Sequence, residues 1–232
     1  MKTLFTILFV VTFRPAVAQS DLVGQIAVWK PKDGFAQHFE KGYKQHLKWH
    51  QVNGDPWSWY GWFIISGPRY GQFVDATFDH SWADLDQSIK PAEDLEDNRL
   101  HVIPFADVQN IFKISYLPEY STADTFAGKL KLVKLITINV DDTGDGLHLI
   151  GRLKDHYISK QIKSFKAYTV IDGGHVNQLL LMLGFTNWKE YGASEDFNHV
   201  VSEYQESREV KTAASIIVET MTYRPDLSYF PK

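Results

Sequence analysis

The spacing of apolar and polar residues changes along the chain between two periods, and these periods predict strands and helices. Residues 22–29 form a short β-rich run that a Lys-Pro-Lys-Asp-Gly turn ends. Within residues 35–50 the apolar side chains recur at helical spacing, with lysines on the opposite side. A helix also begins at Trp82, and a further helix is predicted over 106–110 before a closing strand over 111–116.

Residues 59–65 are apolar at both odd and even positions, whereas a strand with one solvated face alternates apolar with polar residues. We therefore expect this strand to be buried on both faces, with only one of Trp59 and Trp62 pointing between the sheets. One face carries Trp59, Phe63 and Ile65, and the other carries Tyr60, Trp62 and Ile64.

The second half of the chain repeats the layout of the first half. The hairpin turn at Ser66 matches Asp172, and the helix start at Trp82 matches Trp188, both 106 residues apart. The segment that begins at Tyr116 matches the segment that begins at Tyr223, 107 residues apart. Self-similarity in several segments and in one order predicts a tandem duplication. His46 and His156, 110 residues apart, are predicted to be equivalent as well.

Each half has the order β-α-β-β-α-β of a ferredoxin-like unit, so the fold class is α+β. The expected boundaries are 22–121 for the first unit, 122–129 for a linker and 130–229 for the second unit. In this plan the chain resembles the dimeric α/β-barrel superfamily, which includes monooxygenase-like, stress-responsive and chlorite-dismutase-like proteins. The resemblance implies that the two units pack sheet against sheet into a pseudo-dimeric barrel, with the helices outside.

The first residues predict export to a secreted or periplasmic location. Lys2 precedes an apolar run of ten residues, and Ala16-Val17-Ala18 offers a small-residue cleavage site, so 1–18 is interpreted as a signal peptide. Later residues contain no apolar run long enough to span a membrane. The alternative for the first residues is a core strand or a membrane anchor.

Composition narrows the classes of site that the chain can carry. The sequence has no cysteine, which excludes disulfides, thiolate zinc sites and cysteine nucleophiles. A net charge of −4 without a basic stripe argues against a nucleic-acid partner. We expect a small apolar or aromatic ligand as the partner, and a homo-oligomer is compatible with the sequence.

His46 and His50 form the sharpest chemical pattern, because histidines at i and i+4 share a helix face and can bind one metal ion. Without a third ligand we predict no metal and no cofactor. His46 is instead expected to pack beside Tyr43 and Leu47, and His50 to cap the helix end. Haem or a divalent metal at these histidines is the alternative, and the resemblance adds that some relatives use a histidine as haem ligand.

The other candidate ligand-binding residues are aromatic or basic. Aromatic side chains at high density can line a pocket for a flat ligand, although they are also ordinary core. Basic side chains of the two hairpins can hold an anion at a barrel mouth, although hairpin residues are more often merely exposed. With the two equivalent histidines, the candidates are His46, Trp49, Trp59, Trp62, Arg69, Tyr70, His156 and His175.

Three functions are compatible with these features. The preferred hypothesis is an exported barrel that binds a small molecule. The alternatives are a monooxygenase-like or haem-binding enzyme that uses the barrel cavity, and a structural or interaction protein whose barrel is packed with side chains. The sequence leaves open whether the protein is an enzyme.

Overall fold

The structure is a computed structural model that describes residues 22–123, 130–162, 164–208 and 213–231. The predicted signal peptide 1–18 lies outside these residues, as does most of the predicted linker 122–129. Within the described residues, no helix combines the length and the apolarity needed to cross a membrane.

The chain forms two units with the same order of strands and helices, as the sequence predicted. The first unit consists of β1 (Val23–Pro31), α1 (Ala36–Asn53), β2 (Tyr60–Ser66), β3 (Phe73–His80), α2 (Trp82–Leu85), α3 (Pro91–His101) and β4 (Ala106–Tyr116). The second unit consists of β5 (Leu132–Val140), α4 (Thr143–Ser159), β6 (Ser164–Asp172), β7 (Gln178–Phe185), α5 (Trp188–Gly192), α6 (Phe197–Arg208) and β8 (Ala213–Tyr223). A short 3-10 helix follows each unit, at Pro118–Tyr120 and Pro225–Leu227.

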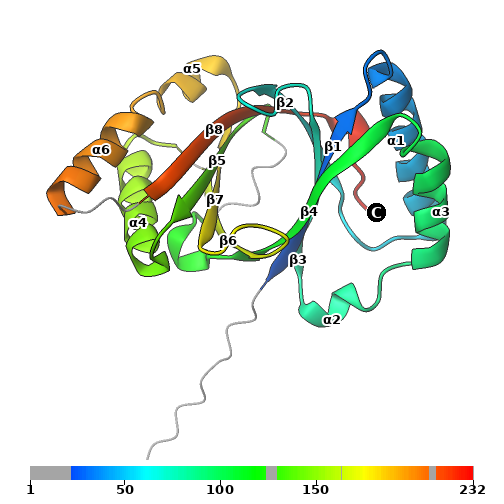
Figure 1. Cartoon of the computed structure of the whole chain (residues 1–232), viewed down its shortest axis with the longest axis horizontal. Coiled ribbons are helices and arrows are strands. Elements are labelled where there is room, and N and C mark those ends of the chain that lie inside the picture. The colour runs from blue at the N-terminus through cyan, green and yellow to red at the C-terminus, as the bar shows by residue number, and fades with distance from the viewer. Residues whose placement is uncertain (1–21, 124–129, 163, 209–212, 232) are drawn as a thin grey trace, which may run out of the picture.

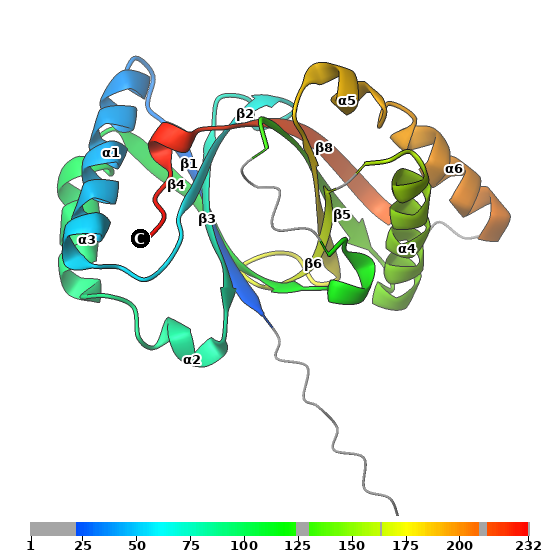
Figure 2. The ribbon, with the colours of Figure 1, turned by 180° about the vertical axis from the view of Figure 1, so that it is seen from behind.

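The eight strands close into one barrel in the order β1-β3-β2-β8-β5-β7-β6-β4, and every neighbouring pair is antiparallel. Each unit contributes a four-stranded sheet, and the two sheets join where β2 pairs with β8 and where β4 pairs with β6. The helices α1 and α3 lie outside the barrel beside the first sheet, and α4 and α6 lie beside the second sheet (Figures 1 and 2). The predicted pseudo-dimeric α/β barrel is therefore confirmed.

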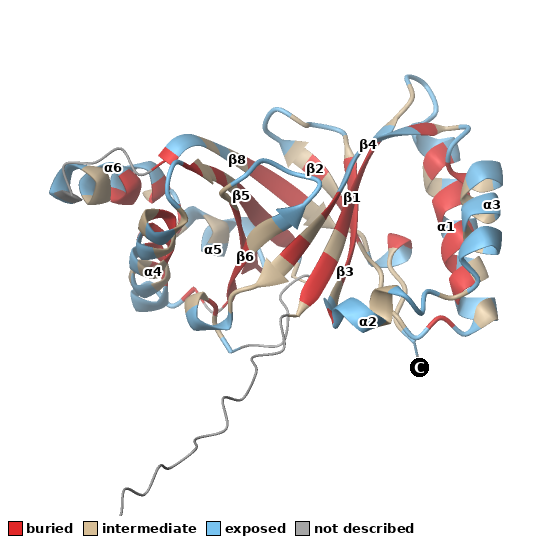
Figure 3. Cartoon of the chain, turned by 60° about the horizontal axis from the view of Figure 1, so that its bottom comes forward, coloured by how far each residue is buried: buried red, intermediate tan, exposed pale blue. Residues whose placement is uncertain are grey.

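Strand β2 is buried on both sides, and its two faces belong to different cores. Trp62 and Ile64 pack into the barrel interior, whereas Phe63 and the preceding Trp59 pack against the helices of the first unit. Burial is concentrated on the barrel strands and on one stripe of α1 (Figure 3). The sequence prediction that only one of the two tryptophans points between the sheets is confirmed, and the inward one is Trp62.

The duplicated segments occupy corresponding places in the two units. Trp82 and Trp188 are the first residues of α2 and α5, and the preceding Ser81 and Asn187 each accept a hydrogen bond from a backbone amide of the first turn. Pro118 and Pro225 each begin the 3-10 helix that follows the last strand. Similar local sequences therefore make the same turns in both halves.

One predicted element is wrong. Residues 106–110, expected to be helical, form the first part of β4, where they pair with the end of β1. Their side chains are mostly exposed, so they lack the alternation that reveals a strand. The helix lies earlier, in α3, where Pro91 occupies the first turn.

Asp75 is a buried carboxyl group beneath α1, and 6% of its surface is exposed. Its Oδ2 accepts hydrogen bonds from the Trp29 indole at 2.9 Å and from the Tyr43 hydroxyl at 3.0 Å. Burial raises the pKa of Asp75 to about 6, although both donors favour the charged form. This pKa is higher in the folded than in the unfolded chain, so the fold favours the protonated carboxyl group. The contribution of Asp75 to the free energy of unfolding is therefore complete at low pH and is lost as the pH rises through about 6.

We predict that Trp62→Ala lowers the free energy of unfolding by about 3–5 kcal/mol, because it leaves a cavity in the barrel interior. Trp82→Ala is the matched control, since Trp82 is 52% exposed, and it should change stability by less than about 1 kcal/mol. Denaturant melts measure both values. Equal losses in the two variants would contradict the assignment of Trp62 to the core.

We predict that Asp75→Asn stabilises the protein increasingly, relative to the wild type, as the pH rises. The asparagine amide oxygen still accepts hydrogen bonds from Trp29 and Tyr43, but the side chain carries no charge to bury. Relative to the wild type, its free energy of unfolding should be higher at pH 7.5 than at pH 4.5 by about 2 kcal/mol. Urea melts of chelator-treated protein at the two pH values test this. A difference that is independent of pH would show that Asp75 does not titrate in this range.

Candidate functional site

The last turns of α1 bring two histidines to the face that packs against α3. His46 and His50 are 5% and 3% exposed, and they belong to the buried stripe of α1 together with Phe39 and Tyr43. The helix ends after Asn53, because Gly54 adopts a left-handed conformation with φ 69°. The prediction that His50 caps this end is wrong, since Gly54 is the cap and both ring nitrogens of His50 contact other side chains.

Helix α3 supplies acidic residues opposite these histidines. Asp94 and Asp97 lie one turn apart on the face of α3 that meets α1, and their side chains are 32% and 13% exposed. The two helices approach closely at Gly42, where an added Cβ atom would lie 1.8 Å from the carbonyl oxygen of His101. Only glycine fits there, so this contact holds the two helices at the distance at which their polar side chains meet.

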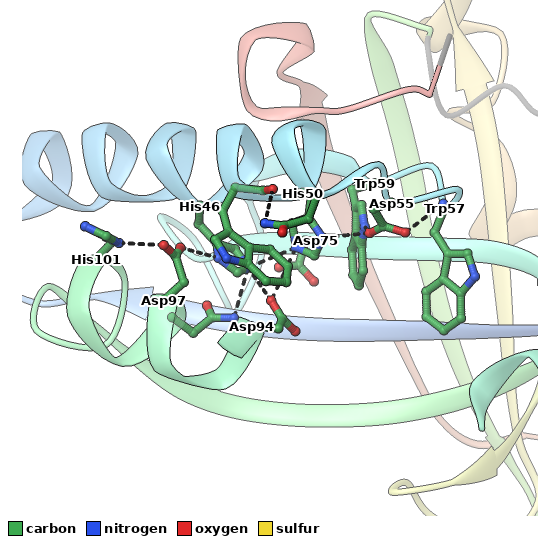
Figure 4. A network of polar contacts seen from close by, with 12 residues as sticks. His46, His50, Asp55, Trp57, Trp59, Asp75, Asp94, Asp97 and His101 are labelled. Atoms are coloured by element: carbon green, nitrogen blue, oxygen red, sulfur yellow. Dashed lines mark hydrogen bonds and ion pairs between the residues drawn. The ribbon is translucent and has the colours of Figure 1, made fainter. Parts of the chain in front are cut away.

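Three potential ligand atoms of this cluster form a small triangle. His46 Nε2 and His50 Nε2 are 3.1 Å apart, and Asp94 Oδ1 lies 3.4 Å from the first and 3.6 Å from the second. Metal–ligand distances in zinc sites are about 2.0–2.2 Å, and atoms at that distance from one tetrahedral ion are about 3.3–3.6 Å apart. The triangle therefore has the dimensions of three ligands around one metal ion (Figure 4).

The other nitrogen of each ring faces a carboxylate. His46 Nδ1 lies 2.8 Å from Asp97 Oδ2, and His50 Nδ1 lies 2.6 Å from Asp55 Oδ2. A neutral imidazole that donates from Nδ1 has a bare lone pair on Nε2. Neutral rings in this orientation therefore point two lone pairs at each other across 3.1 Å. A carboxylate behind each histidine is also the usual outer shell of a metal site.

The protonation equilibria and the unsatisfied atoms agree with this geometry. Burial, reinforced by the neighbouring His50, lowers the pKa of His46 to about 4, which keeps the ring neutral at physiological pH. Among the described residues, the buried Oδ1 atoms of Asp94 and Asn98 have no hydrogen-bond partner. The Asn98 amide nitrogen lies 2.9 Å from His46 Nε2 and can donate a hydrogen bond to its lone pair. A bound cation would satisfy the electron pairs that converge at this point.

A pocket of about 250 Å³ adjoins the cluster and reaches His50 and Asp94. It lies between the outer face of the first sheet, the end of α1 and the segment that joins α2 to α3. Its lining residues are Gln25, His50, Asp55, Trp57, Trp59, Leu85, Ser88, Ile89, Pro91, Asp94 and Lys113. An ion held by His46, His50 and Asp94 would therefore keep open positions toward a space large enough for a small molecule.

The structure separates the predicted tryptophan cluster into two environments. Trp49 stacks on the ring of His46 at 6.3 Å, and the Trp59 indole donates to Asp55 Oδ2 at 2.8 Å, so both belong to the site. Trp62 lies in the barrel interior, on the other face of the sheet. Trp57 lines the pocket, and its backbone amide donates to Asp55 Oδ1.

Arg69, Tyr70 and His175 lie elsewhere, in the two hairpins at one mouth of the barrel. Arg69 and His175 line a hollow of about 420 Å³. The Arg69 guanidinium is paired with the buried carboxylate of Glu219, and Tyr70 is 75% exposed. That these side chains hold an anion stays a prediction, and the charge of Arg69 is already neutralised by Glu219.

The second unit shows what fills the corresponding space when no polar cluster is present. The buried positions of α4 match those of α1 at an offset of 107, which places Leu153 opposite His46 and Tyr157 opposite His50. The starts of α3 and α6 are 106 residues apart, which places the buried Val200 opposite Asp94. The predicted equivalence of His46 and His156 is therefore wrong by about one helical turn. His156 is half-buried and pairs with Asp196 at 2.8 Å.

The described hollow in the barrel interior is too small for the predicted alternative of haem. The hollow that the described interior residues enclose, next to Trp62 and Met221, has a volume of about 10 Å³, room for no more than one water molecule. No histidine belongs to the interior cluster of the described residues. The expectation of no metal is also left without support, because Asp94 supplies the missing third ligand to His46 and His50.

Comparisons with known proteins identify the fold. No protein-family model matches the sequence, and no curated protein sequence matches it. A proposed monooxygenase from Lactobacillus acidophilus NCFM has a similar structure, with a TM-score of 0.60 and 12% identity over 91% of this chain and 97% of that chain. An anthrone oxidase-like protein follows, with a TM-score of 0.57 and 10% identity over 89% of this chain and 93% of that chain.

A variant of chlorite dismutase from Candidatus Nitrospira defluvii is similar as well, with a TM-score of 0.58 and 9% identity over 90% of this chain and 94% of that chain. Identities this low show a shared fold and carry no activity from one protein to another. The chain therefore has the fold of the dimeric α/β-barrel proteins, with both ferredoxin-like units in one polypeptide.

Proposed function

We propose that the protein binds one divalent transition-metal ion through His46, His50 and Asp94 and is a metal-dependent enzyme for a small molecule. The observation that carries this proposal is the convergence of two imidazole Nε2 atoms and a carboxylate oxygen without a hydrogen-bond partner within 3.1–3.6 Å of one another. With Asp97 and Asp55 accepting the Nδ1 protons of neutral rings, the Asn98 amide meets His46 Nε2, and a cation would satisfy the remaining electron pairs of His50 Nε2 and Asp94 Oδ1.

The ligand set favours particular ions. Two imidazoles and one carboxylate with open positions are typical of catalytic zinc sites and of non-haem Fe(II) oxygenases. An ion of this kind supplies either Lewis-acid activation of a bound oxygen group or activation of dioxygen. Structural neighbours described as monooxygenases make Fe(II) the first ion to test beside Zn²⁺.

The protein's own residues have separable roles in this proposal. Asp97 and Asp55 accept the Nδ1 protons of His46 and His50, which fixes each ring with its Nε2 atom toward the ion. Trp57 and Trp59 form an aromatic wall beside His50, whose ring centroid lies 5.0 Å from that of Trp59. This wall shields one side of the pocket from water and presents flat apolar surfaces to a bound molecule.

Binding of a small molecule at the barrel mouth is a second candidate function, and the hollow beside Arg69 and His175 favours it. It is the weaker candidate, because the guanidinium of Arg69 is already paired with Glu219. In addition, no described residue that lines this hollow has a buried polar side-chain atom without a hydrogen-bond partner.

We predict that chelator-stripped protein takes up one equivalent of Zn²⁺, or of Fe²⁺ under anaerobic conditions. His50→Gln and Asp94→Asn should each lower the affinity by more than about 100-fold, because each removes a ligand. Asp97→Asn should lower it by about 10–100-fold, because it removes only the group that orients His46. Isothermal titration and metal analysis measure these values.

His156→Gln is the matched control, since His156 also lies on a helix and pairs with an aspartate but faces no second histidine within hydrogen-bond distance among the described residues. Its metal affinity should equal that of the wild type. Circular dichroism and thermal melts establish that each variant is folded. Uptake of less than about one tenth of an equivalent by folded wild-type protein would contradict the proposal.

We also propose that residues 1–18 direct export and that the mature chain begins at Gln19, which the apolar run and the Ala16-Val17-Ala18 site support. Expression of the full chain in a bacterium, followed by intact-mass measurement of the periplasmic fraction, tests this. A full-length mass in the cytoplasmic fraction alone would contradict it.

A further inference from the structure

The pocket beside His50 and Asp94 has a second polar end, on the outer face of the first sheet. Gln25 of β1 and Lys113 of β4 pair directly in the sheet register, and both line the pocket. The neighbours of Lys113 on β4, Phe112 and Ile114, belong to the barrel interior, so Lys113 points to the outer, helix-covered side. Among the described residues that line the pocket, Lys113 is the only lysine or arginine.

The charge of Lys113 is available to a ligand. Its ammonium group lies 2.8 Å from Asp172 Oδ2, but the Asp172 side chain is 61% exposed and that of Lys113 is 26% exposed. An ion pair with one partner so exposed contributes little because solvent screens it, so an anionic group in the pocket can join or replace Asp172. The acidic groups nearer the ion, Asp55 and Asp94, are already engaged by His50 and by the metal triangle.

The volume of the pocket limits the size of the molecule that can reach both ends. About 250 Å³ equals the volume of about eight water molecules at about 30 Å³ each, which suits one substituted aromatic ring.

The walls between the two ends favour a flat ring. Trp57 and Trp59 lie on one side, and Leu85, Ile89 and Pro91 complete the apolar lining. Three protein ligands on one side of the ion leave adjacent open positions toward the pocket, which two neighbouring oxygens of one molecule can occupy together. Bidentate binding of this kind fixes the orientation of a ligand more strongly than one contact does.

We propose that the substrate is a small aromatic acid that chelates the ion through two adjacent oxygens and places its carboxylate against Lys113. This inference rests on the proposed metal site and adds the class of substrate. It assigns Lys113 as a specificity-determining residue, because a charge-assisted hydrogen bond distinguishes the acid from its neutral analogue.

The experiment uses Zn²⁺-loaded full-length protein and three probes: homoprotocatechuate, which has a chelating catechol and a carboxylate; methylcatechol, which lacks the carboxylate; and phenylacetate, which lacks the chelating oxygens. Isothermal titration gives the affinities, and quenching of tryptophan fluorescence reports occupancy beside Trp57 and Trp59. Metal analysis after each titration establishes that the ion remains bound.

We expect homoprotocatechuate to bind at least about tenfold more tightly than methylcatechol, and phenylacetate to bind more weakly than both. Lys113→Gln should reduce the preference for the acid to less than about threefold and leave the affinity for methylcatechol unchanged. Lys41→Gln, which alters an exposed lysine on α1, is the matched control and should leave the preference intact.

Each other outcome identifies which proposal fails. If Zn²⁺ binds but the two catechols bind equally, or Lys113→Gln keeps the preference, the inferred substrate class is wrong and the metal site stands. If phenylacetate binds as tightly as homoprotocatechuate, chelation is not the mode of binding and the inference is also wrong. If the protein takes up no Zn²⁺, the proposed function fails, and the inference fails with it.

Discussion

The pairing of the two sheets along both of their edges is the interaction on which the rest of the structure depends. Each four-stranded sheet alone would expose the backbone groups of β2 and β4, or of β6 and β8, to water and to other chains. The β2–β8 and β4–β6 ladders satisfy these edges and close the barrel within one chain. The inner faces then bury their apolar side chains against each other, and the described hollow beside Trp62 is reduced to about 10 Å³.

The polar cluster of the proposed metal site lies outside the barrel, in the layer between the first sheet and its helices. In that layer the first unit has the buried His46 and His50 and the half-buried Asp94 where the second unit buries Leu153, Tyr157 and Val200. Buried polar groups are less stabilising than apolar groups of similar volume unless a partner satisfies them. Within one chain, an apolar helix–helix contact in the second unit thus corresponds to a polar and less stabilising contact in the first unit, where the metal site is proposed.

Much of the fold was predictable from the sequence, because local patterns repeat in order in both halves. The two-faced strand that contains Trp62 and the turns at Trp82 and Trp188 follow from residues that are close together in sequence.

Half of the site was visible in the same way, since His46 and His50 share a helix face by spacing alone. Asp94 was not, because it reaches the histidines only through the tertiary contact of α1 with α3. Acidic residues on a polar helix otherwise indicate nothing more than a solvated face. The strand at 106–110 was missed for a related reason, since pairing with β1 determines it and its exposed side chains show no alternation.

At the proposed metal site, the close contact at Gly42 would let a residue that binds no ligand determine which ion fits. The absence of a side chain there sets the spacing of α1 and α3, and this spacing sets the distance from the two imidazoles to the carboxylate. Ions differ in radius by a few tenths of an ångström, so small changes in helix spacing discriminate among them. Evolution within such a scaffold can therefore exchange one ion for another by repacking two helices, while every ligand in the sequence stays the same.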